Sequence, residues 1–274
     1  MTRRLIVNAD DFGLSSSVNR AVLAASREGI LTTASLMVNE GGASEAVALA
    51  RENPRLGVGL HLSLICASPS LSRAEIPGLL SKEKSCFGDN PALAGTRYFF
   101  CRKLHFQLER EIEAQFNKFQ ATGFPLDHVN GHLHFHLHPV VLRILLRRAK
   151  EWGIKALRLT REPLGLDLRL SHGHWFYRLS HAFLFSSLSK WATPFLKRQN
   201  IKHTERVFGL FQNGLVSENY VARLLECLPD GISELYSHPS FDDSKGELDA
   251  LVSPRIRDIV QTRNIDLIRY QDLI

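Results

Sequence analysis

The chain has 274 residues, of which 44% are hydrophobic and 23% are charged, and this composition is typical of a globular protein. No apolar stretch is long enough for a membrane-spanning helix. The net charge of +6 allows an anionic partner, but the basic residues are dispersed and no nucleic-acid-binding motif is present, which argues against nucleic acid as that partner.

The cysteines show no metal-binding or redox spacing. They form no CxxC pair, which argues against a zinc knuckle and against a thioredoxin-like motif. Scattered thiols are typical of a reducing cytoplasm, although their even number is also compatible with disulfides. The N-terminal segment has neither the apolar core nor the cleavage site of a signal peptide, so we expect a cytoplasmic protein. The cysteines are Cys66, Cys86, Cys101 and Cys227.

Strand-like and helix-like segments alternate along the chain. We predict strands at residues 5–7, 31–38, 56–64, 126–130, 156–160, 207–210, 232–237 and 266–269. We predict helices at residues 15–29, 43–51, 106–122, 139–152, 218–227, 247–252 and 255–263. This alternation indicates parallel strands with helical crossovers. Because no linker divides the chain, we predict an α/β fold with one domain over residues 1–274, a single irregular (β/α) barrel.

Two long stretches interrupt the alternation. Residues 65–105 are rich in serine, proline and glycine, and we expect a long loop of the kind that often covers a site. Residues 161–204 form the second interruption. We treat both stretches as insertions in the barrel.

The first predicted strand is followed by two adjacent carboxylates, Asp10 and Asp11. Parallel sheets place ligand sites at the C-terminal ends of their strands. Neighbouring carboxylates repel each other, so they need a cation, a shared proton or good solvation. The alternative is an Asx-type turn that leads into the next helix.

Four histidines alternate with apolar residues directly after the strand at 126–130. They are His132, His134, His136 and His138. In an extended chain all four imidazoles would point to one face, and imidazole is a common neutral ligand of divalent metals. The chain spacing spreads the four over too great a length for a single ion, so we expect only part of the cluster to bind metal.

His61 and His238 stand at the ends of two other predicted strands. Either histidine alone would more often be a hydrogen-bonded core residue. In a barrel, however, these strand ends converge on the face that also carries Asp10, Asp11 and the histidine cluster. Together they predict a metal-assisted hydrolytic site, in which one carboxylate and two histidines bind a cation and other groups move protons.

Four motifs resemble the YdjC-like carbohydrate deacetylases. They are Asn8-Ala9-Asp10-Asp11-Phe12-Gly13, Gly59-Leu60-His61-Leu62, Gly131-His132-Leu133-His134-Phe135-His136 and Glu234-Leu235-Tyr236-Ser237-His238-Pro239. They stand in the family's order over essentially the whole chain. The resemblance implies a distorted TIM-type barrel that hydrolyses the N-acetyl group of an acetamido sugar.

The resemblance also implies roles for individual residues. By it, Asp11, His61 and His132 are the expected metal ligands. Asp10 is the expected general base, and His238 is the expected proton donor to the leaving amine. His134 and His136 are expected to bind substrate or to support the ligands. The family is described with Mg²⁺, whereas a carboxylate with two imidazoles also suits Zn²⁺, so both metals stay open.

The stretch at residues 174–198 departs from the soluble-sugar members of that family. It has apolar side chains roughly on one helical face and basic residues around them, and we expect Pro194 to break the helix near its end. A helix packed on the barrel and an amphipathic surface that contacts a membrane or a lipid tail both remain open. The apolar residues are Phe176, Leu179, Phe183, Leu188, Trp191 and Phe195.

This insertion resembles the hopanoid-biosynthesis-associated branch of the family. That resemblance implies an N-acetylglucosaminyl hopanoid lipid as substrate. Peripheral attachment at the inner membrane surface would be compatible with the expected cytoplasmic location. A soluble chitooligosaccharide deacetylase is the alternative within the family. The sequence leaves the oligomeric state open, including a homo-oligomer.

Other classes of protein fit parts of the pattern. A metal-dependent phosphoesterase also uses aspartate and histidine, but two metals would need more converging carboxylates. Neither a Walker-type phosphate loop nor a GxSxG elbow is present, which argues against nucleotide hydrolysis and against a serine hydrolase. A non-catalytic metal- or carbohydrate-binding protein would not need Asp10 beside Asp11, or a distant His238.

Overall fold

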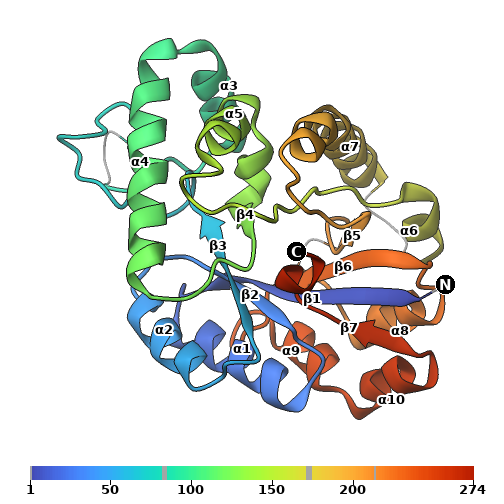
Figure 1. Ribbon diagram of the computed structural model, residues 1–274. Helices are drawn as coiled ribbons and strands as arrows, with labels where there is room; N and C mark the ends of the chain where they lie inside the picture. Colours follow the sequence, from blue (N-terminus) through green and yellow to red (C-terminus); the bar gives the residue numbers. More distant parts are fainter. Residues whose placement is uncertain (1, 82–84, 171–174, 213) are drawn as a thin grey trace.

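The computed structural model describes residues 2–81, 85–170, 175–212 and 214–274 (Figure 1). The strands are β1 (Arg3–Phe12), β2 (Thr33–Leu36), β3 (Gly57–Leu62), β4 (Val129–Gly131), β5 (Arg206–Phe208), β6 (Gly231–Ser237) and β7 (Ile265–Leu267). The α-helices are α1 (Ser16–Glu28), α2 (Ala43–Arg51), α3 (Pro91–Phe100), α4 (Arg102–Ala121), α5 (Pro139–Arg148), α6 (Leu164–Leu170), α7 (Trp175–Arg198), α8 (Glu218–Glu226), α9 (Lys245–Val252) and α10 (Pro254–Thr262). Two 3₁₀ helices are η1 (His132–Leu137) and η2 (Tyr270–Leu273).

The strands form one parallel sheet around β1. The hydrogen-bonded order is β4-β3-β2-β1-β6-β5, and β7 also pairs with β1. The side chains of Leu5, Ile6 and Val7 on β1 are fully buried. A strand buried on both faces reads as a continuous apolar run, which is the pattern that predicted this strand. The parallel α/β class is therefore confirmed.

The described sheet is a parallel half-barrel, and a closed TIM-type barrel is not confirmed. Within the described residues, the path of named strands ends at β4 on one side and at β5 on the other. Isolated parallel bridges, Val129 with Leu157 and Ala156 with Lys202, continue the ladder beyond β4. The strand predicted at 156–160 is thus reduced to its first two residues.

Local sequence explains where several helices begin. Ser15 accepts a hydrogen bond from the backbone N–H of Val18 at the start of α1, as expected for an N-cap serine. Asn90 and Ser253 cap α3 and α10 in the same way, each before a proline. In Figure 1, α1, α2, α9 and α10 lie along one side of the strands, whereas α3, α4, α5 and α7 lie on the other.

Both insertions contain helices. The stretch 65–105 includes α3 and the start of α4, which begins four residues earlier than predicted, and its residues 82–84 lie outside the described part. The stretch 161–204 contains α6 and α7. His174, the first residue of the 174–198 segment, also lies outside the described residues, as do 171–173.

The expectation that Pro194 breaks the helix is wrong, because α7 continues through it to Arg198. None of the described helices is both long and apolar enough to cross a membrane.

The close packing of β3 generates a stability prediction. A Cβ atom on Gly59 would lie 2.5 Å from the imidazole of His128 and 2.7 Å from its carbonyl oxygen. We expect Gly59→Ala to lower the free energy of unfolding by about 2 kcal/mol or more, because the backbone cannot move aside easily. Urea unfolding followed by circular dichroism measures this. Gly41→Ala is the matched control, since nothing lies within 4 Å of its Cβ position. Equal stability of the two variants would contradict the packing.

Candidate metal centre

The C-terminal end of β1 carries both Asp10 and Asp11, and a β-bulge orients them. The register of β1 against β2 shifts between Ala9 and Phe12, and Asp11 adopts a left-handed backbone conformation with φ of 61°. In a regular strand, neighbouring side chains point to opposite faces. Here the bulge re-aims the chain, so that both carboxylates approach the imidazole of His61. Such backbone strain is often found at functional sites.

Asp11, His61 and His132 form a compact cluster. Asp11 Oδ1 lies 3.2 Å from His61 Nε2 and 3.0 Å from His132 Nδ1. One possible ligand atom from each residue lies within 4.8 Å of the other two. His61 is buried, whereas the Asp11 and His132 side chains keep 14% and 20% of their surface exposed. The structure thus brings together the three predicted metal ligands, with access from solvent on one side.

Asn130 orients His61. The two residues are paired between β3 and β4, and His61 Nδ1 lies 2.8 Å from Asn130 Oδ1. Because an amide oxygen only accepts, Nδ1 carries the proton. A neutral His61 then directs the lone pair of Nε2 at the Asp11 carboxylate, which is repulsive unless a cation or a second proton lies between them. This arrangement is typical of metal-binding histidines that are held by an outer hydrogen bond.

The pKa values within the cluster show how its members stabilise one another. Burial alone would raise the pKa of Asp11, but the hydrogen bond from His132 and, when Nε2 also carries a proton, the one from His61 hold it well below its ordinary value. Burial alone would lower the pKa of His132, but the Asp11 carboxylate raises it. A metal that binds through His132 must displace this proton, so metal affinity should depend on pH.

A buried arginine lies beneath the cluster, and sequence reasoning missed it. The Arg158 guanidinium donates to Asp10 Oδ2 at 2.7 Å and to Asp10 Oδ1 at 3.0 Å. It also donates to Glu234 Oε1 at 2.7 Å. The other oxygen of Glu234 accepts a hydrogen bond from the Tyr270 hydroxyl. The available signal was an arginine within the apolar run at residues 156–160, where only a paired charge is tolerated.

The fixed charges of the site favour a divalent cation. Asp10, Asp11 and Glu234 contribute three negative charges, and Arg158 contributes one positive charge, so the sum is −2 when the histidines are neutral. Uncompensated buried charge is costly. One carboxylate oxygen and two imidazole nitrogens form a donor set that suits Zn²⁺, with a position left for a further ligand. The residues therefore fit a metal ion.

Asp10 is held in its ionised form. Burial opposes ionisation, but Arg158 and His61 together lower the pKa of Asp10 below its ordinary value. Its Oδ1 also accepts hydrogen bonds from the side-chain amides of Asn8 and Asn130. The positive charge that His238 can carry contributes to the same effect, which places His238 near this carboxylate at the end of β6.

The extended arrangement predicted for the histidine cluster is wrong. Residues 132–137 form η1, in which Leu133 and His134 have left-handed φ values of 48° and 59°. The backbone turn separates the imidazoles instead of aligning them on one face. His138 leaves the cluster altogether, because its Nε2 lies 3.0 Å from the carbonyl oxygen of Gly95. Of the four histidines, only His132 belongs to the cluster with Asp11 and His61.

His134 and His136 lie behind the triad. His134 Nε2 is 3.2 Å from the Tyr236 hydroxyl, and its Nδ1 is 3.3 Å from Thr160 Oγ1. His136 is fully buried, and its Nε2 donates to the carbonyl oxygen of Arg158 at 3.0 Å. Burial and the Arg158 charge lower the pKa of His136 to about 3. His136 is therefore neutral and supports the loop that carries Arg158.

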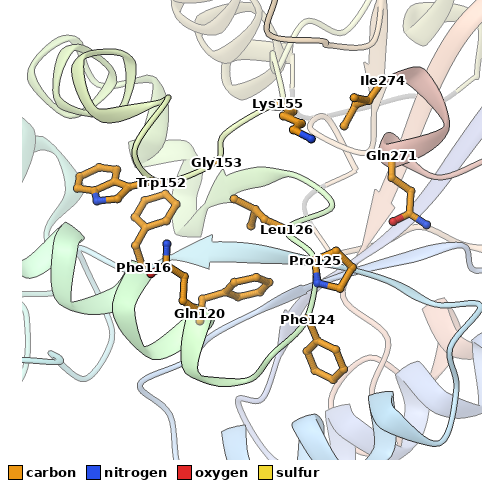
Figure 2. Close-up of a pocket in the computed structure, with 11 residues that line it drawn as sticks. Phe116, Gln120, Phe124, Pro125, Leu126, Trp152, Gly153, Lys155, Gln271 and Ile274 are labelled. Atoms are coloured by element: carbon orange, nitrogen blue, oxygen red, sulfur yellow. The ribbon is translucent and has the colours of Figure 1, made fainter.

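A cavity of about 520 Å³ lies away from this cluster (Figure 2). Figure 2 shows Phe116 and Trp152 side by side in its wall, and their rings stack at 4.4 Å. Its lining includes Leu126, which precedes β4, whereas His132 follows β4. The cavity and the cluster thus lie at opposite ends of that strand, and the cavity contains none of the predicted site residues.

The whole chain is similar to proteins of one family. The model of the YdjC-like protein family matches residues 4–262. The chain belongs to the YdjC-like family. A carbohydrate deacetylase of Clostridium beijerinckii is 27% identical over 290 residues, which cover 98% of this chain and 100% of that protein.

Two further relatives of this YdjC-like chain match over part of their length. A carbohydrate deacetylase of Brevibacillus brevis is 42% identical over 151 residues, 55% of this chain and 57% of that protein. One of Geobacillus stearothermophilus is 36% identical over 154 residues, 56% of this chain and 59% of that protein. The matched region thus spans less than two thirds of these two relatives.

Solved structures confirm the fold. A crystal structure from Enterococcus faecalis, of a protein assigned to cellobiose-phosphate cleavage, superimposes with a TM-score of 0.76 and 22% identity, covering 100% of this chain and 99% of that one. An uncharacterised protein of Agrobacterium tumefaciens gives a TM-score of 0.55 and 11% identity, covering 100% of this chain and 89% of that one. At this identity the likeness concerns the fold alone.

The first prediction from this site concerns metal affinity. We expect His132→Ala to abolish tight binding of Zn²⁺, because it removes a ligand. We expect Asn130→Ala to weaken binding by about 10- to 100-fold, because it removes the group that orients His61. Equilibrium dialysis with metal analysis measures both. His138→Ala is the matched control, since His138 contacts α3 rather than the cluster, and equal affinity in all three variants would overturn the assignment.

The second prediction concerns Arg158. Arg158→Met would leave Asp10 and Glu234 as buried, uncompensated charges, so we expect a loss of about 3–5 kcal/mol in the free energy of unfolding. Adding Asp10→Asn and Glu234→Gln should restore part of that loss. Arg255→Met, which removes an exposed ion pair with Glu218, should change stability by less than about 1 kcal/mol. Denaturant unfolding that shows equal effects for the two arginines would contradict the buried network.

Proposed function

We propose that this protein is a metal-dependent hydrolase that removes the N-acetyl group from an acetylated amino sugar. The observation that supports this most directly is the convergence of Asp11, His61 and His132 to within 4.8 Å, with the ionised Asp10 beside them. Membership of the YdjC-like family and the carbohydrate deacetylases among its relatives support the same reaction.

Each residue has a role in this proposal. Asp11, His61 and His132 hold the metal, and a divalent cation there would polarise the amide carbonyl and lower the pKa of water. Asp10 accepts the proton of the attacking water. Because its pKa is low, Asp10 is a weak base and accepts a proton only from a donor that has itself been made acidic. His238 then protonates the leaving amine, as an imidazolium can near neutral pH.

The metal is Zn²⁺ or Mg²⁺ in this proposal. Two imidazole nitrogens favour Zn²⁺, since Mg²⁺ prefers oxygen ligands and retains several waters. His134 and His136 are proposed to support the site from behind η1. The Tyr236 hydroxyl, 3.2 Å from His134 Nε2, ties this support to β6, the strand that ends at His238.

The finer assignment is the hopanoid-biosynthesis-associated branch, with an N-acetylglucosaminyl hopanoid lipid as substrate. The large α7 insertion beside the site supports it. Acetate release from a matched pair of substrates tests it: a soluble N-acetylglucosamine oligosaccharide and N-acetylglucosamine linked to a polycyclic lipid alcohol. Release from the oligosaccharide alone would favour a chitooligosaccharide deacetylase. Release from neither by metal-loaded protein would favour a phosphoesterase or a binding protein.

The role of Asp10 generates a kinetic prediction. We expect Asp10→Asn to keep its metal and to lose about 10²- to 10⁴-fold in the rate of acetate release, the usual contribution of a general base. Glu234→Gln is the matched control, because it also removes a carboxylate from Arg158 but leaves the proposed base in place. A normal rate in Asp10→Asn would refute this role.

A further inference from the structure

Exposed apolar side chains are concentrated around the candidate site. Among the described residues, sixteen large apolar side chains are exposed, and eleven of them lie on α3, at the start of α4, on η1 or on α7. Single exposed apolar residues are normal, but a concentration of them marks an interaction surface. Those eleven are Leu93, Phe99, Phe100, Phe106, Leu133, Phe176, Leu179, Phe183, Leu184, Trp191 and Phe195.

Helix α7 packs on the protein through a face other than the predicted apolar one. Its buried residues include Ala182, Phe185 and Leu196. By contrast, Phe176 and Phe183 keep 88% and 80% of their surface exposed. The apolar face anticipated from the sequence is therefore largely turned outward, which leaves it available to a partner.

Helix α3 repeats this arrangement. Tyr98 is buried and donates a hydrogen bond from its hydroxyl to the carbonyl oxygen of Leu64. The adjoining Phe99 and Phe100 keep 50% and 76% of their surface exposed. Phe106, on the first turns of α4, is 68% exposed. This helix is thus anchored by one aromatic residue and presents its neighbours to solvent.

Both helices contact η1, the turn that begins with the proposed ligand His132. The ring of Tyr98 on α3 lies 6.0 Å from that of Phe135, and the ring of Phe185 on α7 lies 5.0 Å from that of His134. Leu133, which is also on η1, is 46% exposed. Figure 1 shows α5, which follows η1, between α3 and α7. Helices α3 and α7, which carry most of the exposed apolar side chains, therefore both pack against the turn that begins with His132.

The charges of these segments are of one sign. Residues 91–108 and 175–198 contain no aspartate or glutamate, although the chain has 28 acidic residues in total. Both segments carry exposed basic residues, Arg102 and Lys103 on the first and Lys190, Lys197 and Arg198 on the second. Exposed aromatic side chains beside basic residues are typical of surfaces that bind the interface of an anionic membrane.

We propose that α3 and α7 dock the candidate site onto a bilayer that carries anionic headgroups. The aromatic side chains enter the boundary between headgroups and acyl chains, and the basic residues contact the headgroups. A protein attached in this way presents the mouth of its metal site to substrates held in the membrane. The reason for docking rests on the proposed function, but the docking itself is independent of catalysis.

Sedimentation with vesicles tests the proposal. We expect the full-length protein to bind vesicles of phosphatidylcholine with phosphatidylglycerol at least tenfold more strongly than vesicles of phosphatidylcholine alone. Phe100→Ser with Phe183→Ser should abolish binding. Lys190→Gln with Lys197→Gln should weaken it more than tenfold, since each basic residue near an anionic surface contributes about fivefold. Leu267→Ser, at an exposed leucine on β7, and Lys118→Gln with Lys245→Gln are the matched controls and should bind normally.

The outcomes separate this proposal from the proposed function. Hydrolysis of a soluble acetylated sugar without vesicle binding would overturn docking alone, whereas vesicle binding without any hydrolysis would leave docking standing. The alternative is that a second copy of the chain binds this surface. Sedimentation velocity tests for such a dimer. Two results together would overturn the membrane assignment. The protein would not bind vesicles, and it would form a dimer that the double substitution Phe100→Ser with Phe183→Ser converts to monomer.

Discussion

The buried charge of Arg158 is the constraint on which the site depends. Its guanidinium joins Asp10 at the end of β1 to Glu234 on β6, two neighbouring strands of the sheet. Without it, two carboxylates would lie in the core without compensation, at a cost that few folds tolerate. With it, Asp10 stays ionised and fixed in position, beside the cluster in which Asp11 meets two histidines. The stability of the core and the geometry of the candidate site thus depend on the same buried arginine.

Much of the site was predictable because it follows from strand ends. Asp11, His61 and His132 each stand where a predicted parallel strand ends, and the C-terminal ends of such strands share one edge. What sequence could not give was the bulge that aims Asp11, since it arises from the mismatch between β1 and β2. The parallel core could also be predicted, because its buried strands appear as apolar runs. Whether the sheet closes into a barrel could not be predicted, because closure depends on pairing between distant segments.

The misjudged elements fail for identifiable reasons. Alternating histidine and apolar residues after β4 resembled an extended strand, but left-handed residues at 133 and 134 turn the chain into η1. On α7, the sequence left open whether the largest apolar side chains form the packing face or an exposed amphipathic surface. The helix packs through a face that includes Ala182, Phe185, Ala192 and Leu196. Large side chains on the other face remain exposed. Which face of α7 is buried depends on tertiary packing and cannot be predicted from the helix sequence alone.

X-ray absorption spectroscopy of the Zn²⁺-loaded protein tests the central claim most directly, because it reports the ligands without reference to turnover. We expect two imidazole nitrogens and a carboxylate oxygen at about 2.0–2.2 Å from the metal. Replacing His61 and His132 by alanine should remove both imidazole contributions. A bound metal whose spectrum lacks imidazole, or does not change in that double variant, would contradict the assignment of Asp11, His61 and His132 as the metal centre.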